Sequence, residues 1–84
     1  MVKYTLTEHA KEALTKRRVA SEWLERTLAN PQFVQPDPTD SSLEHRLAVI
    51  PEHGDRVLRV IVNTSVTPLR VVTLYFDRNM KGRL

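Results

Sequence analysis

The stretch RVLRVIVNTSVTPLRVVTLYF, residues 56–76, contains two strand-length apolar runs joined by a turn-forming link. The even-numbered positions of both runs are apolar: Leu58, Val60 and Val62 in the first run, and Val72, Leu74 and Phe76 in the second. Because successive side chains of a strand point to opposite faces, antiparallel pairing of the two runs gives one apolar face. The odd-numbered positions, Val71 among them, then lie on the other face, where we expect Arg59 opposite Tyr75.

Further strands are predicted on both sides of the loop PDPTDSS, residues 36–42, which is rich in turn formers and too polar for the interior. Residues 43–50 form a strand-length run, and residues 32–35 a shorter one. With residues 56–64 and 69–76, residues 43–50 are expected to form an antiparallel meander. Residues 2–6 alternate well enough to predict a short edge strand.

Two short helices are predicted between residues 8 and 30. Thr5 and Glu8 have the spacing of a capping box, and Thr7 is a competing cap, so the first helix should begin near residue 8 and end near residue 18. Ser21 should cap a second helix, which Asn30 and the following proline end. The prediction is a single α+β domain over residues 1–84, with an N-terminal αα-hairpin on one face of a three- to four-stranded antiparallel sheet. Residues 77–84 would be a basic, partly flexible tail.

Composition narrows the classes of function. The chain has 84 residues, a net charge of +3 and no cysteine, which excludes disulfides and thiolate metal sites. No histidine spacing indicates a metal site, and neither a metal nor another cofactor is expected. No apolar run is long enough to span a membrane, so a cytoplasmic protein is predicted. The cations are concentrated near both ends of the chain, and they would form one nucleic-acid-binding surface if the fold brings those ends together; an ordinary solvated surface is the alternative.

Several short motifs together resemble a known superfamily. They begin with Thr7 followed by His-Ala at residues 9–10 and an Arg-rich helix end, continue with Asn-Pro at residues 30–31, and finish with VVT-x-Y at residues 71–75. This order resembles the RelE/ParE-like toxins, and within them a bacterial family of short proteins of unknown function. Ala13 stands where members commonly have an arginine. The resemblance implies a RelE-like fold and, as one activity found in that superfamily, metal-independent RNA cleavage.

Catalytic candidates follow from that resemblance. RNA cleavage through the 2′-hydroxyl needs a proton acceptor, a proton donor and cations that stabilise the phosphorane. The candidates are Arg59, Tyr75, His9 and His45. Each has a structural alternative: Arg59 as an ordinary outward-facing strand residue, Tyr75 as an amphipathic packing residue, and His9 as a partner in a structural hydrogen bond.

The candidates for substrate binding are the cationic and hydroxyl residues near the same surface: Arg17, Arg46, Thr73, Arg78 and Lys81. Arg17 belongs to the cluster at residues 16–18, which a helix C-terminus also favours electrostatically. The predicted partners are an antitoxin protein, RNA or the ribosome, and a second copy of the chain. Two functions stay open: a ribonuclease toxin of a toxin–antitoxin system, or a non-catalytic module that binds protein or nucleic acid on the same scaffold.

Overall fold

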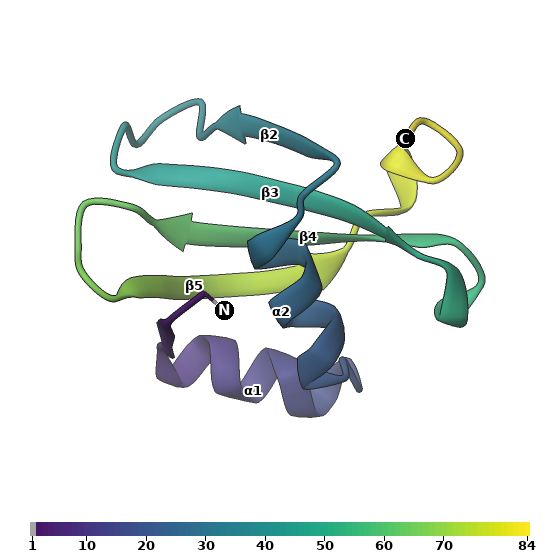
Figure 1. Cartoon of the computed structure of the whole chain (residues 1–84), viewed down its shortest axis with the longest axis horizontal. Coiled ribbons are helices and arrows are strands. Elements are labelled where there is room, and N and C mark those ends of the chain that lie inside the picture. Colours follow the sequence, from purple (N-terminus) through teal and green to yellow (C-terminus); the bar gives the residue numbers. More distant parts are fainter. Residues whose placement is uncertain (1) are drawn as a thin grey trace.

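The computed structural model describes residues 2–84, which form one five-stranded sheet with two helices on one side (Figure 1). The strands lie in the order β1-β5-β4-β3-β2. Their bounds are β1 Tyr4–Leu6, β2 Phe33–Pro36, β3 Leu43–Ile50, β4 Arg56–Asn63 and β5 Leu69–Phe76. The helices are α1 Glu8–Lys16 and α2 Ser21–Ala29, and short 3₁₀ turns, η1 Pro51–His53 and η2 Arg78–Met80, follow β3 and β5.

Local signals explain both helices. The Thr7 hydroxyl caps α1 by accepting the Ala10 N–H at 3.0 Å, so the competing cap in the sequence is the one used. The same hydroxyl donates to the Val72 carbonyl at 2.8 Å and thereby ties the helix start to β5. Arg18 has a φ of 52°, in the left-handed region, where the chain turns from α1 into α2. Ser21 is the first residue of α2, and no side chain caps that helix.

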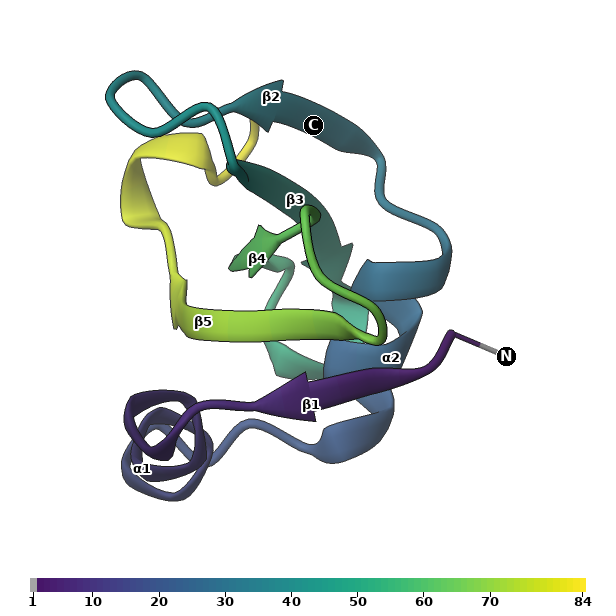
Figure 2. The same cartoon turned by 90° about the vertical axis from the view of Figure 1, so that its left-hand side faces the viewer.

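The hydrophobic core lies between the helices and the sheet. α1 packs on β5 and β1, whereas α2 packs on β4 and β3 (Figures 1 and 2). The largest fully buried apolar side chains between these layers are Leu24, Leu28, Ile50, Leu58, Val60, Val62, Val71 and Leu74. Both helices therefore cover the same face of the sheet, and the opposite face is left for other contacts.

The predicted fold class is wrong in its sheet and in the place of its helices. The sheet has five strands and is mixed, because β1 pairs with β5 in parallel. β1 precedes the helices, and each helix packs on different strands, so the helices do not form an N-terminal hairpin on an antiparallel sheet. The physical reason is burial: at the open edge of β5, the side chains of Val2, Tyr4 and Leu6 pack against the core.

The predicted register is correct for the part of the β4–β5 pair that runs from Leu58 to Ile61. Arg59 lies opposite Tyr75, as expected, and Val60 lies opposite Leu74. A bulge next to Ile61 then shifts the pairing by one residue. Val71 is fully buried as a result, whereas Val72 is only partly buried. The prediction that Val72 rather than Val71 faces the core is therefore wrong.

Candidate nucleic-acid interface

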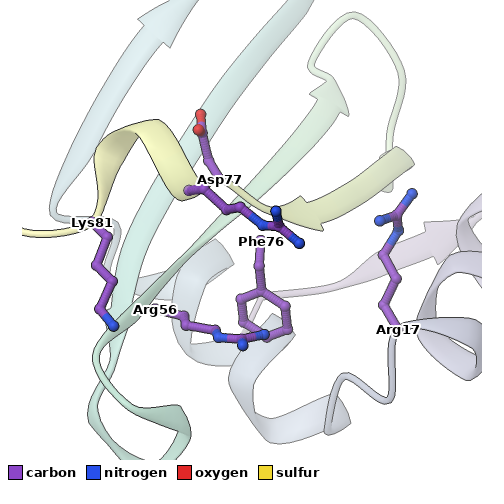
Figure 3. Close-up of a pocket in the computed structure, with 6 residues that line it drawn as sticks. Arg17, Arg56, Phe76, Asp77 and Lys81 are labelled. Carbon is purple, nitrogen blue, oxygen red and sulfur yellow. The ribbon is translucent and has the colours of Figure 1, made fainter.

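A basic pocket of about 550 Å³ opens where β4 begins and β5 ends (Figure 3). Its lining residues are mostly cations: Arg17, Arg56, Phe76, Asp77, Arg78 and Lys81. In Figure 3, Lys81 and Arg17 lie at opposite sides, with Arg56 and the Phe76 ring between them. The pocket thus combines four positive charges with one aromatic ring.

Three separate parts of the chain supply these cations. Arg17 is the C-terminal cap of α1, and its backbone N–H donates to the Ala13 carbonyl. Arg56 is the first residue of β4. Arg78 and Lys81 come from the segment after β5, which begins with a hydrogen bond from the Asp77 N–H to the Val57 carbonyl at 2.8 Å. The fold therefore gathers cations from both ends of the chain.

None of these four cations forms an ion pair with a carboxylate among residues 2–84. The one carboxylate that lines the pocket, Asp77, is held by Arg59, with 2.8 Å between Asp77 Oδ2 and Arg59 Nη2. The charge of Asp77 is thus paired with that of Arg59, which does not line the pocket. The pocket keeps its positive charge and can bind an anion without breaking an internal pair.

The aromatic ring of the pocket belongs to a cluster of three. The centroid of the Phe76 ring lies 4.8 Å from that of His53 and 6.3 Å from that of Trp23. Trp23 projects from α2, and His53 lies in η1. These contacts hold the Phe76 ring in place where it lines the pocket among cations.

A hydrogen-bonded chain of four charged or polar side chains crosses β3 and β4 next to the pocket. Arg59 Nε donates to Asp77 Oδ2 at 2.9 Å, and Arg59 Nη1 lies 2.7 Å from His45 Nδ1. His45 Nε2 lies 2.7 Å from Asp37 Oδ1. Arg59 and His45 are each only 8% exposed. This Asp37–His45–Arg59–Asp77 chain, hereafter the polar chain, links the β2–β3 loop to the C-terminal segment.

The geometry of the polar chain indicates which ring nitrogen of His45 accepts a hydrogen bond and which one donates. The guanidinium has only donors, so His45 Nδ1 accepts from it, and His45 Nε2–H donates to Asp37. His45 Nδ1 therefore carries no proton in this arrangement. The hydrogen bond from His45, together with the backbone N–H of Thr39, lowers the pKa of Asp37 to about 2. Asp37 stays ionised throughout the physiological range.

The structure brings some of the predicted site residues together and separates others. Arg59 and His45 are in contact, with Tyr75 paired to Arg59 across the strands. Thr73 lies on the same strand as Tyr75, opposite Ile61. His9, by contrast, is exposed on α1, on the helical side of the sheet.

Arg46 is separated from the pocket as well. Its Nε donates to Glu44 at 2.8 Å, and its Nη1 donates to the Leu28 carbonyl at 2.9 Å. The bond to Leu28 ties β3 to the end of α2, and the pair with Glu44 lies within β3, so both contacts hold the side chain in the fold. Arg17, Arg78 and Lys81 are thus the predicted binding residues that share the pocket.

Sequence reasoning missed Arg56 and Phe76 in the pocket, and Asp37 and Asp77 in the polar chain. A signal existed for the first pair, because the register that places Arg59 opposite Tyr75 also brings the start of β4 beside the end of β5. Asp37 lies in a loop and Asp77 just after a strand. Outside a helix or strand, no periodicity indicates where a side chain points. The sequence near Asp37 and Asp77 therefore gave no signal of their contacts.

The fold and the pocket define a small α+β domain with a basic pocket. A family model described as a domain of unknown function (DUF4258) matches residues 6–76, and the chain therefore belongs to this family. The matched range includes both helices and β2 to β5, contains only Leu6 of β1, and ends before Arg78 and Lys81. The comparisons with curated proteins and with solved structures found no match.

No helix among residues 2–84 is long and apolar enough to cross a membrane. In the same range, no three side chains of the types His, Cys, Asp and Glu are grouped so that they could hold a metal ion.

Proposed function

We propose that this protein binds RNA, and that the basic pocket holds the phosphate backbone. The observation that carries the proposal is the convergence of four cations without carboxylate partners, from three parts of the chain, in one pocket. Placing four like charges close together does not stabilise the fold of a small domain, because the charges repel one another. A polyanionic partner would turn that repulsion into attraction through charge-assisted hydrogen bonds and counterion release.

The residue types favour RNA over a small inorganic anion. Three of the four cations are arginines, whose planar forks match phosphate oxygens. The Phe76 ring among them offers a surface on which an unpaired base can stack, as aromatic side chains do in many RNA-binding proteins. Phosphate contacts and one stacking surface together suit a flexible single strand.

The binding test compares two double variants that remove the same charge. Arg78→Ala with Lys81→Ala removes two pocket cations, whereas Lys3→Ala with Arg70→Ala removes two exposed cations near the opposite end of β5. Fluorescence anisotropy of a labelled single-stranded RNA gives the Kd of each. We expect the pocket variant to bind on the order of tenfold more weakly than the control variant. Equal affinities would refute the pocket as the RNA site.

RNA cleavage is the second candidate function, with the protein acting as a ribonuclease toxin of the RelE/ParE-like type. The contact between His45 and Arg59, with Tyr75 opposite, favours it, because a histidine, an arginine and a tyrosine are residue types that such cleavage uses. Induced expression of wild type and Arg59→Ala in a bacterial host, followed by growth and total RNA, tests it. Unaffected growth and intact RNA with the wild type would refute it.

The remaining partners depend on which function holds. A ribonuclease toxin would need an antitoxin protein and could act on the ribosome, whereas a non-catalytic module would need neither. Both functions place the protein in the cytoplasm, where RNA is abundant. Self-association into a homodimer would add a second pocket and strengthen binding to one RNA strand.

A further inference from the structure

We infer that Arg59 and His45 are positioning residues for the basic pocket: the polar chain holds the C-terminal segment so that Arg78 and Lys81 face the bound anion, and protonation of His45 releases it. This inference rests on the proposed function, because it concerns how that same pocket is assembled. It gives the two residues a role other than catalysis, since each acts through Asp77.

The first step is the attachment of the C-terminal segment. Its backbone is held by the Asp77 N–H bond to the Val57 carbonyl. Its side-chain attachment is the ion pair between Asp77 and Arg59, where Nε and Nη2 both lie within 2.9 Å of Oδ2. Asp77 Oδ1 in turn accepts the Asn79 N–H at 3.0 Å and so caps η2. Asp77 thus joins the Arg59 guanidinium to the turn that carries Arg78.

The second step is the orientation of the guanidinium. Arg59 Nη1 is held by His45 Nδ1, on the side opposite the contact with Asp77. Because the guanidinium is planar and rigid, Nη1 cannot leave His45 without also turning Nε and Nη2. The orientation of His45 is set by its bond to Asp37. The imidazole therefore fixes the orientation in which Arg59 holds Asp77.

The third step is the effect of a proton on His45. Protonation at Nδ1 replaces the acceptor with a donor, and it places two cations face to face at 2.7 Å in a buried site. Asp37 attracts the added proton, but it lies at Nε2 and cannot restore the acceptor at Nδ1. The charged groups that contact or flank His45 are Asp37, Arg59, Asp77 through Arg59, and the Glu44–Arg46 pair on its own strand. We expect the contact between His45 and Arg59 to break.

The sign of the effect separates this inference from general electrostatics. Acidification makes the net charge of a protein more positive, and added positive charge strengthens binding to RNA. A fall in affinity on acidification is therefore opposite to the general trend. Release of Arg78 and Lys81, two of the four pocket cations, would cause such a fall.

Two variants separate the two bonds of His45. An asparagine places Oδ1 where Nδ1 stands, so His45→Asn keeps an acceptor for Arg59 and cannot be protonated. A glutamine reaches the position of Nε2, so His45→Gln keeps a donor for Asp37 and loses the acceptor for Arg59. Both variants lack the imidazole, but only His45→Gln also lacks the contact with Arg59. Comparing the two variants therefore isolates the effect of that contact.

The experiment measures RNA affinity at about pH 8 and about pH 5.5. Amide hydrogen exchange of residues 77–84 is followed in parallel. We expect the wild type to lose affinity on the order of tenfold at the lower pH, and the segment to lose protection after exchange rates are divided by the intrinsic rates at each pH. His45→Asn should bind at least as tightly at the lower pH as at the higher pH, and His45→Gln should bind weakly at both.

Two results would overturn the inference: protection of residues 77–84, relative to intrinsic exchange, that does not change with pH in the wild type, or a pH profile of His45→Asn like that of the wild type. Failure of RNA binding by the wild type at about pH 8 would refute the proposed function instead. In that case the exchange measurement still tests the inference. Protection that is independent of pH in the wild type refutes it without any variant, so misfolding of either substitution leaves the test intact.

Discussion

Replacement of Arg59 by alanine should destabilise the fold more than an ordinary surface substitution does. The change removes the ion pair with Asp77 and the hydrogen bond to His45 in one step. The side chains of Arg59 and Asp77 are only 10% and 12% exposed. Water therefore cannot fully solvate the carboxylate and the imidazole that lose their partner.

The expected cost is about 3 kcal/mol of unfolding free energy, at the lower end of the range for breaking a buried ion pair because a small exposed fraction remains. A chain of 84 residues has a total stability of about 4 to 12 kcal/mol. Lys11→Ala is the control, since its pair with Glu8 is 58% and 88% exposed, and it should cost less than about 0.5 kcal/mol.

Urea denaturation, followed by the fluorescence of the single tryptophan, measures both variants. With an m value of about 1 kcal/mol/M, the midpoint for Arg59→Ala should fall by about 3 M. A loss below about 1 kcal/mol would refute the buried ion pair as a stabilising contact. The result also governs the expression test, because loss of toxicity in Arg59→Ala indicates catalysis only if the variant is still folded at the growth temperature.

Three further predictions concern pH, packing and register. The ionised Asp37 stabilises the fold above its unfolded pKa of about 4, and this contribution is lost as the pH falls towards its folded pKa of about 2. Asp37→Asn should therefore make the loss of stability in acid less steep, as measured by urea titrations at several pH values. Leu24→Ala should cost about 3 kcal/mol because Leu24 is fully buried, whereas Phe33→Ala should cost less than about 0.5 kcal/mol because Phe33 is 41% exposed; thermal unfolding compares them. Val71→Asn should lower the melting temperature more than Val72→Asn, and the reverse order would contradict the bulge.

Sequence reasoning placed the elements well because their signals are local. The predicted strand at residues 43–50 agrees with β3, and the helix start near residue 8 agrees with α1. The alternation of residues 56–76 was enough to pair Arg59 with Tyr75. Caps, turn formers and alternation act over a few residues, so one sequence contains the necessary information.

The errors arose where distant contacts decide the structure. β1 has three residues, too few to indicate which strand it pairs with or in which direction. The bulge beside Ile61 shifts the register without any glycine or proline to mark it. Arg59 was expected on a solvent-facing or anion-binding surface, yet two partners from other elements bury it. In each case the deciding partner is far away in the sequence.

The dependence of RNA affinity on salt tests the central claim most directly. Binding of a single strand by four pocket cations should give a slope of log K against log salt of about −2.8, and Arg78→Ala with Lys81→Ala should reduce its magnitude to about 1.4. The control, Lys3→Ala with Arg70→Ala, should keep the wild-type slope. No measurable RNA binding, or an equal reduction of the slope in both variants, would contradict the account.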